Sequence, residues 1–134
     1  MERGFSILEL MIVVVIVVIV TTFAVPSYAK YIERSRGKSA QANLTLIHNM
    51  EKRYKLDNGA YYECATSPAG CSLAVINAEL GLFIRDSYFN YNIAINGLSG
   101  YKVTATRLAS GACSGNTMTV TDASSEITKE CLAW

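Results

Sequence analysis

Residues 5–26 read FSILELMIVVVIVVIVTTFAVP. The run holds about 21 mostly apolar residues, and a helix of that length reaches about 30 Å, the thickness of a bilayer core. Its many β-branched residues do not argue against a helix, because unpaired backbone groups in lipid are costly enough to force helical hydrogen bonding. We therefore expect residues 5–26 to form a membrane-spanning helix.

Glu9 is the residue in this stretch that needs an explanation. A carboxylate inside a membrane helix costs about 2.5–3.5 kcal/mol on insertion scales, so its presence indicates a function and a partner. The alternative of a cleaved secretory signal, cut after residues 27–29, is disfavoured by Glu9 and by the length of the apolar run. Residues 1–4 are expected to be a short leader peptide.

The chain becomes polar after Pro26, and helical periodicity continues. An apolar stripe is expected on the helix, which should end near Asp57-Asn58 with Gly59 as its C-cap; the stripe comprises Ile32, Ala40, Leu44, Ile47, Met50 and Tyr54. The preceding basic residues either stay near lipid headgroups or filament grooves, or are simply solvated; they are Lys30, Arg34, Arg36 and Lys38.

A change of period after the helix indicates a small sheet. Residues 60–87 are expected to be a loop, and residues 89–95 and 101–106 alternate as two antiparallel strands joined by a turn at 97–100. Residues 117–121 should form a third strand. The sequence thus predicts an α+β fold, in which a long N-terminal helix packs on a small antiparallel sheet and residues 27–134 make up the globular domain, which the family resemblance described next places on the extracytoplasmic side.

The segment Gly4-Phe5-Ser6-Ile7-Leu8-Glu9 and the apolar run behind it resemble the processing motif of type IV pilins and pseudopilins. The resemblance implies this same pilin-like fold, cleavage between Gly4 and Phe5 by prepilin peptidase, and N-methylation of Phe5. It also implies that Glu9 pairs with the N-terminal amine of a neighbouring subunit. Pro26 removes a backbone donor and, with Thr21 and Thr22 upstream, is expected to bend or loosen the helix, and in the family a proline at this place accompanies a stretch that unwinds in the filament. Residues 50–54 and 59–61 resemble the minor-pilin branch.

Four cysteines allow three disulfide connectivities, which the sequence leaves open. The resemblance, with its disulfide-bounded C-terminal region, favours Cys64–Cys71 and Cys113–Cys131. Zinc is disfavoured because the spacings are not CxxC and the chain has a single histidine. Neither a metal nor another cofactor is expected.

Catalysis has little support in the sequence. There is no glycine-rich phosphate loop and no recognisable nucleophile turn. His48 is expected to be a surface or interface residue of the helix, while Glu51 beside Lys52 and Asp86 beside Arg85 are expected to be ordinary surface charge. The formal net charge of +1 does not predict a nucleic-acid partner.

The function expected from these features is that of a structural, non-enzymatic subunit of a type IV pilus. Expected partners are further copies or other pilins, prepilin peptidase, the inner-membrane assembly platform and, before assembly, membrane lipid. The precursor would lie in a bacterial inner membrane and the product in an extracellular pilus. Two alternatives stay open: a pseudopilin of type II secretion in a periplasmic pseudopilus, and a singly anchored extracytoplasmic binding domain. Whether such a filament serves cell adhesion or twitching motility depends on parts outside this chain.

Overall fold

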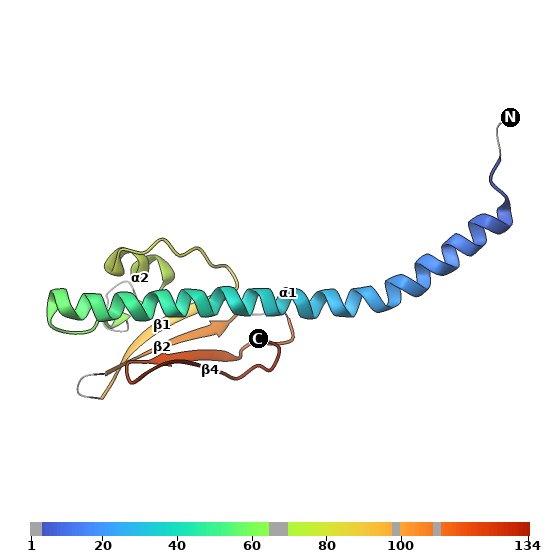
Figure 1. Cartoon of the computed structure of the whole chain (residues 1–134). Coiled ribbons are helices and arrows are strands. Elements are labelled where there is room, and N and C mark those ends of the chain that lie inside the picture. The colour runs from blue at the N-terminus through green and yellow to red at the C-terminus, as the bar shows by residue number, and fades with distance from the viewer. Residues whose placement is uncertain (1–3, 65–69, 98–99, 109–110) are drawn as a thin grey trace. The chain divides into compact units, whose positions relative to one another are not determined.

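The computed structural model describes residues 4–64, 70–97, 100–108 and 111–134. Its elements follow in the order α1 (Ile7–Asn58), α2 (Leu73–Leu80), β1 (Phe89–Asn96), β2 (Gly100–Arg107), β3 (Thr117–Thr121) and β4 (Ser124–Lys129) (Figure 1). The expected α+β architecture is confirmed. Three leader residues, 1–3, and two residues of the expected turn, 98 and 99, lie outside the described ranges. The chain divides into two compact units, Met1–Ile32 and Glu33–Trp134.

Helix α1 runs without a break from Ile7 to Asn58. In its apolar part, the hydroxyls of Thr21 and Thr22 are satisfied by the helix backbone. Thr21 Oγ1 donates to the Val17 and Val18 carbonyls at 2.9 Å, and Thr22 Oγ1 donates to the Val18 carbonyl at 2.8 Å. The bend expected near Pro26 stays a prediction.

The C-terminal end of α1 confirms the expected cap. Gly59 adopts a left-handed conformation with φ 80°, and its N–H donates to the Lys55 carbonyl at 2.8 Å. Glycine adopts this conformation without the Cβ penalty of other residues, so it ends the helix at low cost.

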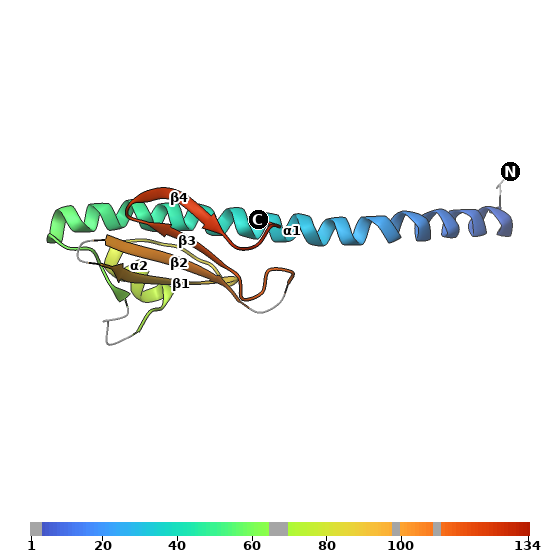
Figure 2. The ribbon, with the colours of Figure 1, turned by 90° about the horizontal axis from the view of Figure 1, so that it is seen from below.

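The second unit contains an antiparallel meander in the order β1-β2-β3-β4 (Figure 2). Ile93 pairs with Val103, and Val103 pairs in turn with Val120, so apolar residues of three strands line one face. This face packs on the second half of α1. The three strands predicted from alternation are confirmed.

Two elements were missed by the sequence interpretation. Strand β4 has one half-buried apolar residue, Ile127, so its alternation is too weak to detect. Helix α2 lies inside the segment expected to be a loop. Its boundaries are nevertheless encoded locally: Ser72 is the N-cap and accepts from the Val75 N–H at 3.4 Å, and Gly81 closes the helix with φ 65°.

The core differs from the expected helix stripe. Ala40, Leu44 and Ile47 are fully buried as expected, whereas the flanking members of the stripe, Ile32, Met50 and Tyr54, are only half-buried. The helix face that meets the sheet instead includes four residues not chosen for it, which are Glu33, Gly37, His48 and Glu51. Helix α2 adds Ile76 and Leu80 to the same core.

Two disulfides close the loops of this unit. Cys64 is bonded to Cys71 with Cα atoms 4.9 Å apart, and Cys113 to Cys131 with Cα atoms 5.7 Å apart. The second bond joins the loop after β2 to the segment after β4. By restricting the unfolded chain, each bond is expected to stabilise this thin domain by about 2–4 kcal/mol.

Candidate assembly helix and its anchoring in the domain

The apolar part of α1 is exposed from Ile7 to Phe23. An 18-residue window of this helix has a mean hydropathy of 2.9 with none of it buried, so the helix is long and apolar enough to cross a membrane. Side chains such as Ile7, at 80% exposure, and Val13, at 49%, contact little else in the chain. An apolar surface of this size requires lipid or other helices to cover it.

Gly4 and Phe5, the residues expected to be processed, lie with Glu9 at the start of this helix, whereas Pro26, the other residue expected to act in assembly, lies farther along α1. Gly4 and Phe5 precede α1, and the Phe5 side chain is 78% exposed. Glu9 lies in the first turn of α1, where the helix dipole favours a carboxylate. Within the ranges that the structure describes, Glu9 has no ion-pair partner. A partner for it is therefore sought in another molecule. The four cysteines lie apart from this site, in the second unit.

A buried ion pair fastens α1 to the sheet where the second unit begins. Arg107 donates to Glu33 through two parallel hydrogen bonds, from Nε to Oε1 at 2.8 Å and from Nη2 to Oε2 at 3.1 Å. Its Nη1 donates to the Tyr88 and Leu108 carbonyls. The Arg107 hydrogen bonds hold the pKa of Glu33 below its ordinary value, against the effect of burial, and Glu33 raises the pKa of Arg107. Both groups are therefore charged at neutral pH.

This pair was missed at the sequence level, although a signal for each partner was present. Arg107 continues the inward-facing series Tyr101, Val103 and Ala105 of β2, so alternation alone places it inside. Glu33 lies seven residues before Ala40, which is two helical turns earlier on the same face. A buried cation and a buried anion on facing elements are expected to pair.

Three further polar residues are buried between α1 and β2, and two of them correct the sequence interpretation. His48 is 3% exposed and Glu51 is fully buried, so neither is a surface residue. The Tyr101 hydroxyl lies 2.7 Å from His48 Nδ1 and donates to the His48 carbonyl at 3.0 Å. Burial lowers the pKa of His48 and raises the pKa of Tyr101.

Glu51 is the least well compensated of these groups. Its Oε2 accepts the Tyr62 N–H at 3.0 Å, and Oε1 has no hydrogen-bond partner in the described part of the chain. Burial raises the pKa of Glu51 to about 7, and the hydrogen bond from Tyr62 opposes only part of that effect. The carboxyl is thus partly protonated at neutral pH.

Asp86 is also more than surface charge. It accepts the Tyr91 hydroxyl at 2.6 Å and the backbone N–H of Tyr88 at 2.8 Å, and Asn43 of α1 donates to the same carboxylate at 3.3 Å. Asp86 thereby ties the segment before β1 to the helix. The role is structural, since its partners are a buried tyrosine, the Asn43 amide and backbone.

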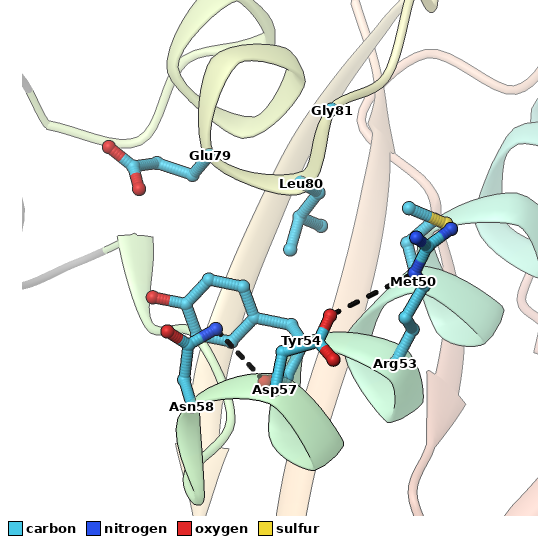
Figure 3. A pocket seen from close by; sticks show the side chains of 8 residues that line it. All are labelled: Met50, Arg53, Tyr54, Asp57, Asn58, Glu79, Leu80 and Gly81. Atoms are coloured by element: carbon cyan, nitrogen blue, oxygen red, sulfur yellow. Dashed lines mark hydrogen bonds and ion pairs between the residues drawn. The ribbon is translucent and has the colours of Figure 1, made fainter.

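A cavity of about 530 Å³ opens between the last turns of α1 and the end of α2. Figure 3 shows the ion pair from Arg53 Nε to Asp57 Oδ2, 3.9 Å long, and the hydrogen bond from Asn58 to the Tyr54 carbonyl, with Glu79 across from them. The lining contains neither a serine, cysteine or threonine nucleophile nor a histidine base. Across the described ranges, no group of three or more His, Cys, Asp or Glu side chains is placed to hold a metal ion.

The chain was compared with known families and proteins. Residues 26–119 match the family model described as type IV minor pilin ComP, DNA uptake sequence receptor. This match begins at the end of the apolar run and ends inside β3, so it is independent of the motif around Gly4 and Glu9. The match covers well over half of the chain.

Individual relatives agree with the family match. The type IV major fimbrial protein FimA of Dichelobacter nodosus is 35% identical over 97 residues, 67% of this chain and 56% of that protein. The type IV major pilin protein PilA of Myxococcus xanthus is 35% identical over 64 residues, 48% of this chain and 29% of that protein. The type II secretion system core protein G of Vibrio cholerae is 37% identical over 60 residues, 45% of this chain and 41% of that protein.

The matched segments thus span between 29% and 56% of these relatives' own lengths. No solved structure matches the chain significantly. A long N-terminal helix with an exposed apolar part and a small antiparallel sheet are the features of the pilin-like fold. The chain belongs to the type IV pilin family, in the branch whose model is that of the minor pilin ComP. The family match points to a structural role, and the family implies assembly into a filament with other pilins.

Proposed function

We propose that this chain is a minor subunit of a type IV pilus, cleaved between Gly4 and Phe5 by prepilin peptidase and methylated on Phe5. The observation that carries the proposal is Glu9, which is exposed in an apolar helix without an ion-pair partner in the described ranges. Cleavage creates an amine on Phe5 that is mostly cationic at neutral pH. The amine of one subunit and Glu9 of the next then neutralise one another as the helices pack.

The pairing chiefly fixes the register in which neighbouring helices pack. A buried ion pair often only breaks even against its desolvation, but leaving one of its charges alone in an apolar core costs several kcal/mol. Helices that pack out of register, or subunits that retain residues 1–4, would leave Glu9 unpaired. Insertion through an inner-membrane assembly platform would follow cleavage, with residues 27–134 on the extracytoplasmic side.

The experiment that tests this proposal is mass spectrometry of the N-terminal peptide, with Glu9→Gln as the variant and Glu126→Gln, an exposed acid in β4, as the matched control. We expect N-methylated Phe5 in sheared surface filaments of the parent and of Glu126→Gln, and its loss from filaments of Glu9→Gln. An intact Met1 in filaments, or normal incorporation of Glu9→Gln, would refute the mechanism and favour a singly anchored domain.

A pseudopilin of type II secretion is the competing assembly, supported by the resemblance to core protein G of Vibrio cholerae. Both assemblies use the same processing motif, so cleavage does not separate them. Location does: a pilus subunit is recovered from sheared surface filaments, whereas a pseudopilin stays in the periplasm when secretion operates. Recovery only from the periplasm would move the assignment to the pseudopilin.

DNA binding is a second candidate function, favoured by the family description, which names a DNA uptake sequence receptor. The supporting observation is the outward face of β1, β2 and β3, which bears exposed Lys102 and otherwise uncharged side chains. The polar members of this face are Asn90, Asn92, Thr104, Thr106, Thr117, Thr119 and Thr121. Glu130 accepts the Thr117 N–H at the edge of this face, and the amides and hydroxyls away from that carboxylate can bond phosphates and base edges.

This candidate is tested by fluorescence anisotropy of labelled duplex DNA with the full chain in nanodiscs. Lys102→Glu is compared with Lys52→Glu, the same charge change on an exposed position of α1. If Lys102 binds a phosphate, its variant alone has a weaker affinity, and the slope of log K against log salt concentration becomes shallower by about 0.9. Equal effects of the two variants on affinity, or no DNA binding by the parent, would exclude this face as a DNA-binding surface.

A further inference from the structure

Two segments wrap around α1 at the end of the domain where the second unit begins. A Cβ on Gly111, in the loop after β2, would lie 2.9 Å from Glu33 Oε2, and a Cβ on Gly37 would lie 2.5 Å from Trp134 Cδ1. The Cys113–Cys131 bond joins the two segments. We call residues 108, 111–116 and 131–134 the collar.

The collar exposes apolar side chains that the domain itself does not cover. Leu132 is fully exposed at 102%, and Leu108 and the adjoining Tyr88 are 44% and 43% exposed. Trp134 is half-buried, with one side of its ring 5.5 Å from the Phe89 ring. Leucine, tyrosine and tryptophan together at one end of a domain are the composition of a membrane-interface belt.

The charges beside the collar are mainly basic. Arg34 and Lys38 are exposed on α1, and the Arg36 guanidinium lies 4.1 Å from the Tyr88 ring centroid. The acid among them, Glu33, is buried and neutralised by Arg107. Glu130, next to the collar, is exposed, and its carboxylate accepts the Thr117 N–H at 2.8 Å. This distribution complements anionic headgroups.

The length of the chain identifies the surface that the collar can reach. Seven residue steps separate Pro26, at the end of the expected membrane span, from Glu33. Even a fully extended chain would span no more than about 25 Å over that length. Wherever residues 5–26 cross a bilayer, the collar is therefore held close to the lipid surface.

From this juxtaposition we propose that the collar, with Arg34 and Lys38, docks on the anionic headgroup layer of the membrane before the subunit enters a filament. Leu132 inserts among the headgroups, the basic side chains bind lipid phosphates, and the Trp134 ring lies at the interface. Assembly then requires the collar to leave the lipid surface as the helix leaves the bilayer. This contact goes beyond the proposed role as a pilus subunit, and does not depend on processing at Gly4.

The test uses Trp134, the single tryptophan of the sequence, as an intrinsic probe. The full chain is reconstituted at high dilution in vesicles of phosphatidylcholine and phosphatidylglycerol, with a spin label either on the headgroup or deep in the acyl chain. We expect strong quenching of Trp134 fluorescence by the headgroup label and weak quenching by the deep label. Replacing Arg34 and Lys38 with Gln should lower the equilibrium constant for docking of the collar on the membrane by about fivefold for each charge removed.

The matched control moves the probe away from the collar. In the double variant Trp134→Phe and Leu56→Trp, the tryptophan lies in an 86% exposed position, 19 residues beyond Gly37 and thus about 28 Å farther along α1. That probe should escape headgroup quenching, and circular dichroism verifies that the variant folds. Absence of headgroup quenching at Trp134, or equal quenching of both probes, would overturn the proposal. Shielding of Trp134 that appears only at high protein-to-lipid ratio would assign the collar to a second subunit instead.

Discussion

Substitution of Glu51 by glutamine should stabilise the domain at alkaline pH. Glutamine keeps the shape of the side chain and an oxygen that can accept the Tyr62 N–H, which lies 3.0 Å from Glu51 Oε2. It removes the charge that the carboxyl acquires at high pH. That charge is costly because Glu51 is fully buried and its second oxygen has no hydrogen-bond partner among the described residues.

The magnitude follows from the pKa of Glu51, which is raised from 4.5 to about 7. Because the folded state holds this proton more tightly than the unfolded state does, the stability contributed by Glu51 is fully present below about pH 4.5 and is lost as pH rises through about 7. A shift of this size corresponds to about 3 kcal/mol. The advantage of Glu51→Gln over the parent should grow by about that amount between about pH 4 and pH 8.5.

The assay is urea unfolding of the full chain in detergent with both disulfides intact, followed by Trp134 fluorescence. Other titrating groups, including His48, change equally in parent and variant, so the difference isolates Glu51. Glu79→Gln, the same change at an exposed position of α2, is the control and should show no such trend. If the free-energy difference between Glu51→Gln and the parent stayed constant from acid to alkaline pH, the account of a destabilising buried carboxylate would be wrong.

Two further substitutions test how α1 is fastened to the domain. Arg107→Met removes the two short hydrogen bonds to Glu33 and leaves it with the Arg36 ion pair at 3.7 Å and the Trp134 Nε1–H at 3.5 Å. The variant should lower the free energy of unfolding by about 3 kcal/mol, measured by urea unfolding, and a decrease below about 1 kcal/mol would contradict a buried role for the pair. Gly37→Ala should displace the Trp134 ring, since the new Cβ would lie 2.5 Å from Trp134 Cδ1. Overpacking costs about 1–3 kcal/mol, offset by about 1 kcal/mol from the better helix propensity of alanine. The decisive measurement is therefore the emission wavelength of Trp134, which should shift to the red, and an unchanged spectrum would contradict the packing at Gly37.

Local sequence signals predicted much of the fold because the periods of helix and strand are local properties. The alternation around Tyr91 and Val103 gave the strands and their inward faces, and Gly59 marked the end of α1 through its tolerance of positive φ. The residues proposed for processing were likewise chosen from one short segment, in which Glu9 interrupts an apolar run.

The polar core could not be predicted in the same way. Burial of Glu33, His48 and Glu51 depends on which face of α1 meets the sheet, and hydropathy favours a face without charged residues. The pairing of Glu33 with Arg107 joins residues 74 positions apart, so strand alternation and helical spacing place each side chain inward but do not show that the two meet. Helix α2 carried its own N-cap and C-cap, but at eight residues it is shorter than the windows in which periodicity is reliable.

The sequence by itself determined the α+β class, the length and apolar character of residues 5–26, and the position of an acid within that apolar run, since composition and period over a few turns suffice for each. Tertiary structure alone decided that Glu33, His48 and Glu51 lie inside, that Arg107 neutralises the first of them, and that Trp134 packs on Gly37. The reason is that the free energy of a buried polar group is set by the partner that folding brings to it, and that partner lies on a different element of the chain.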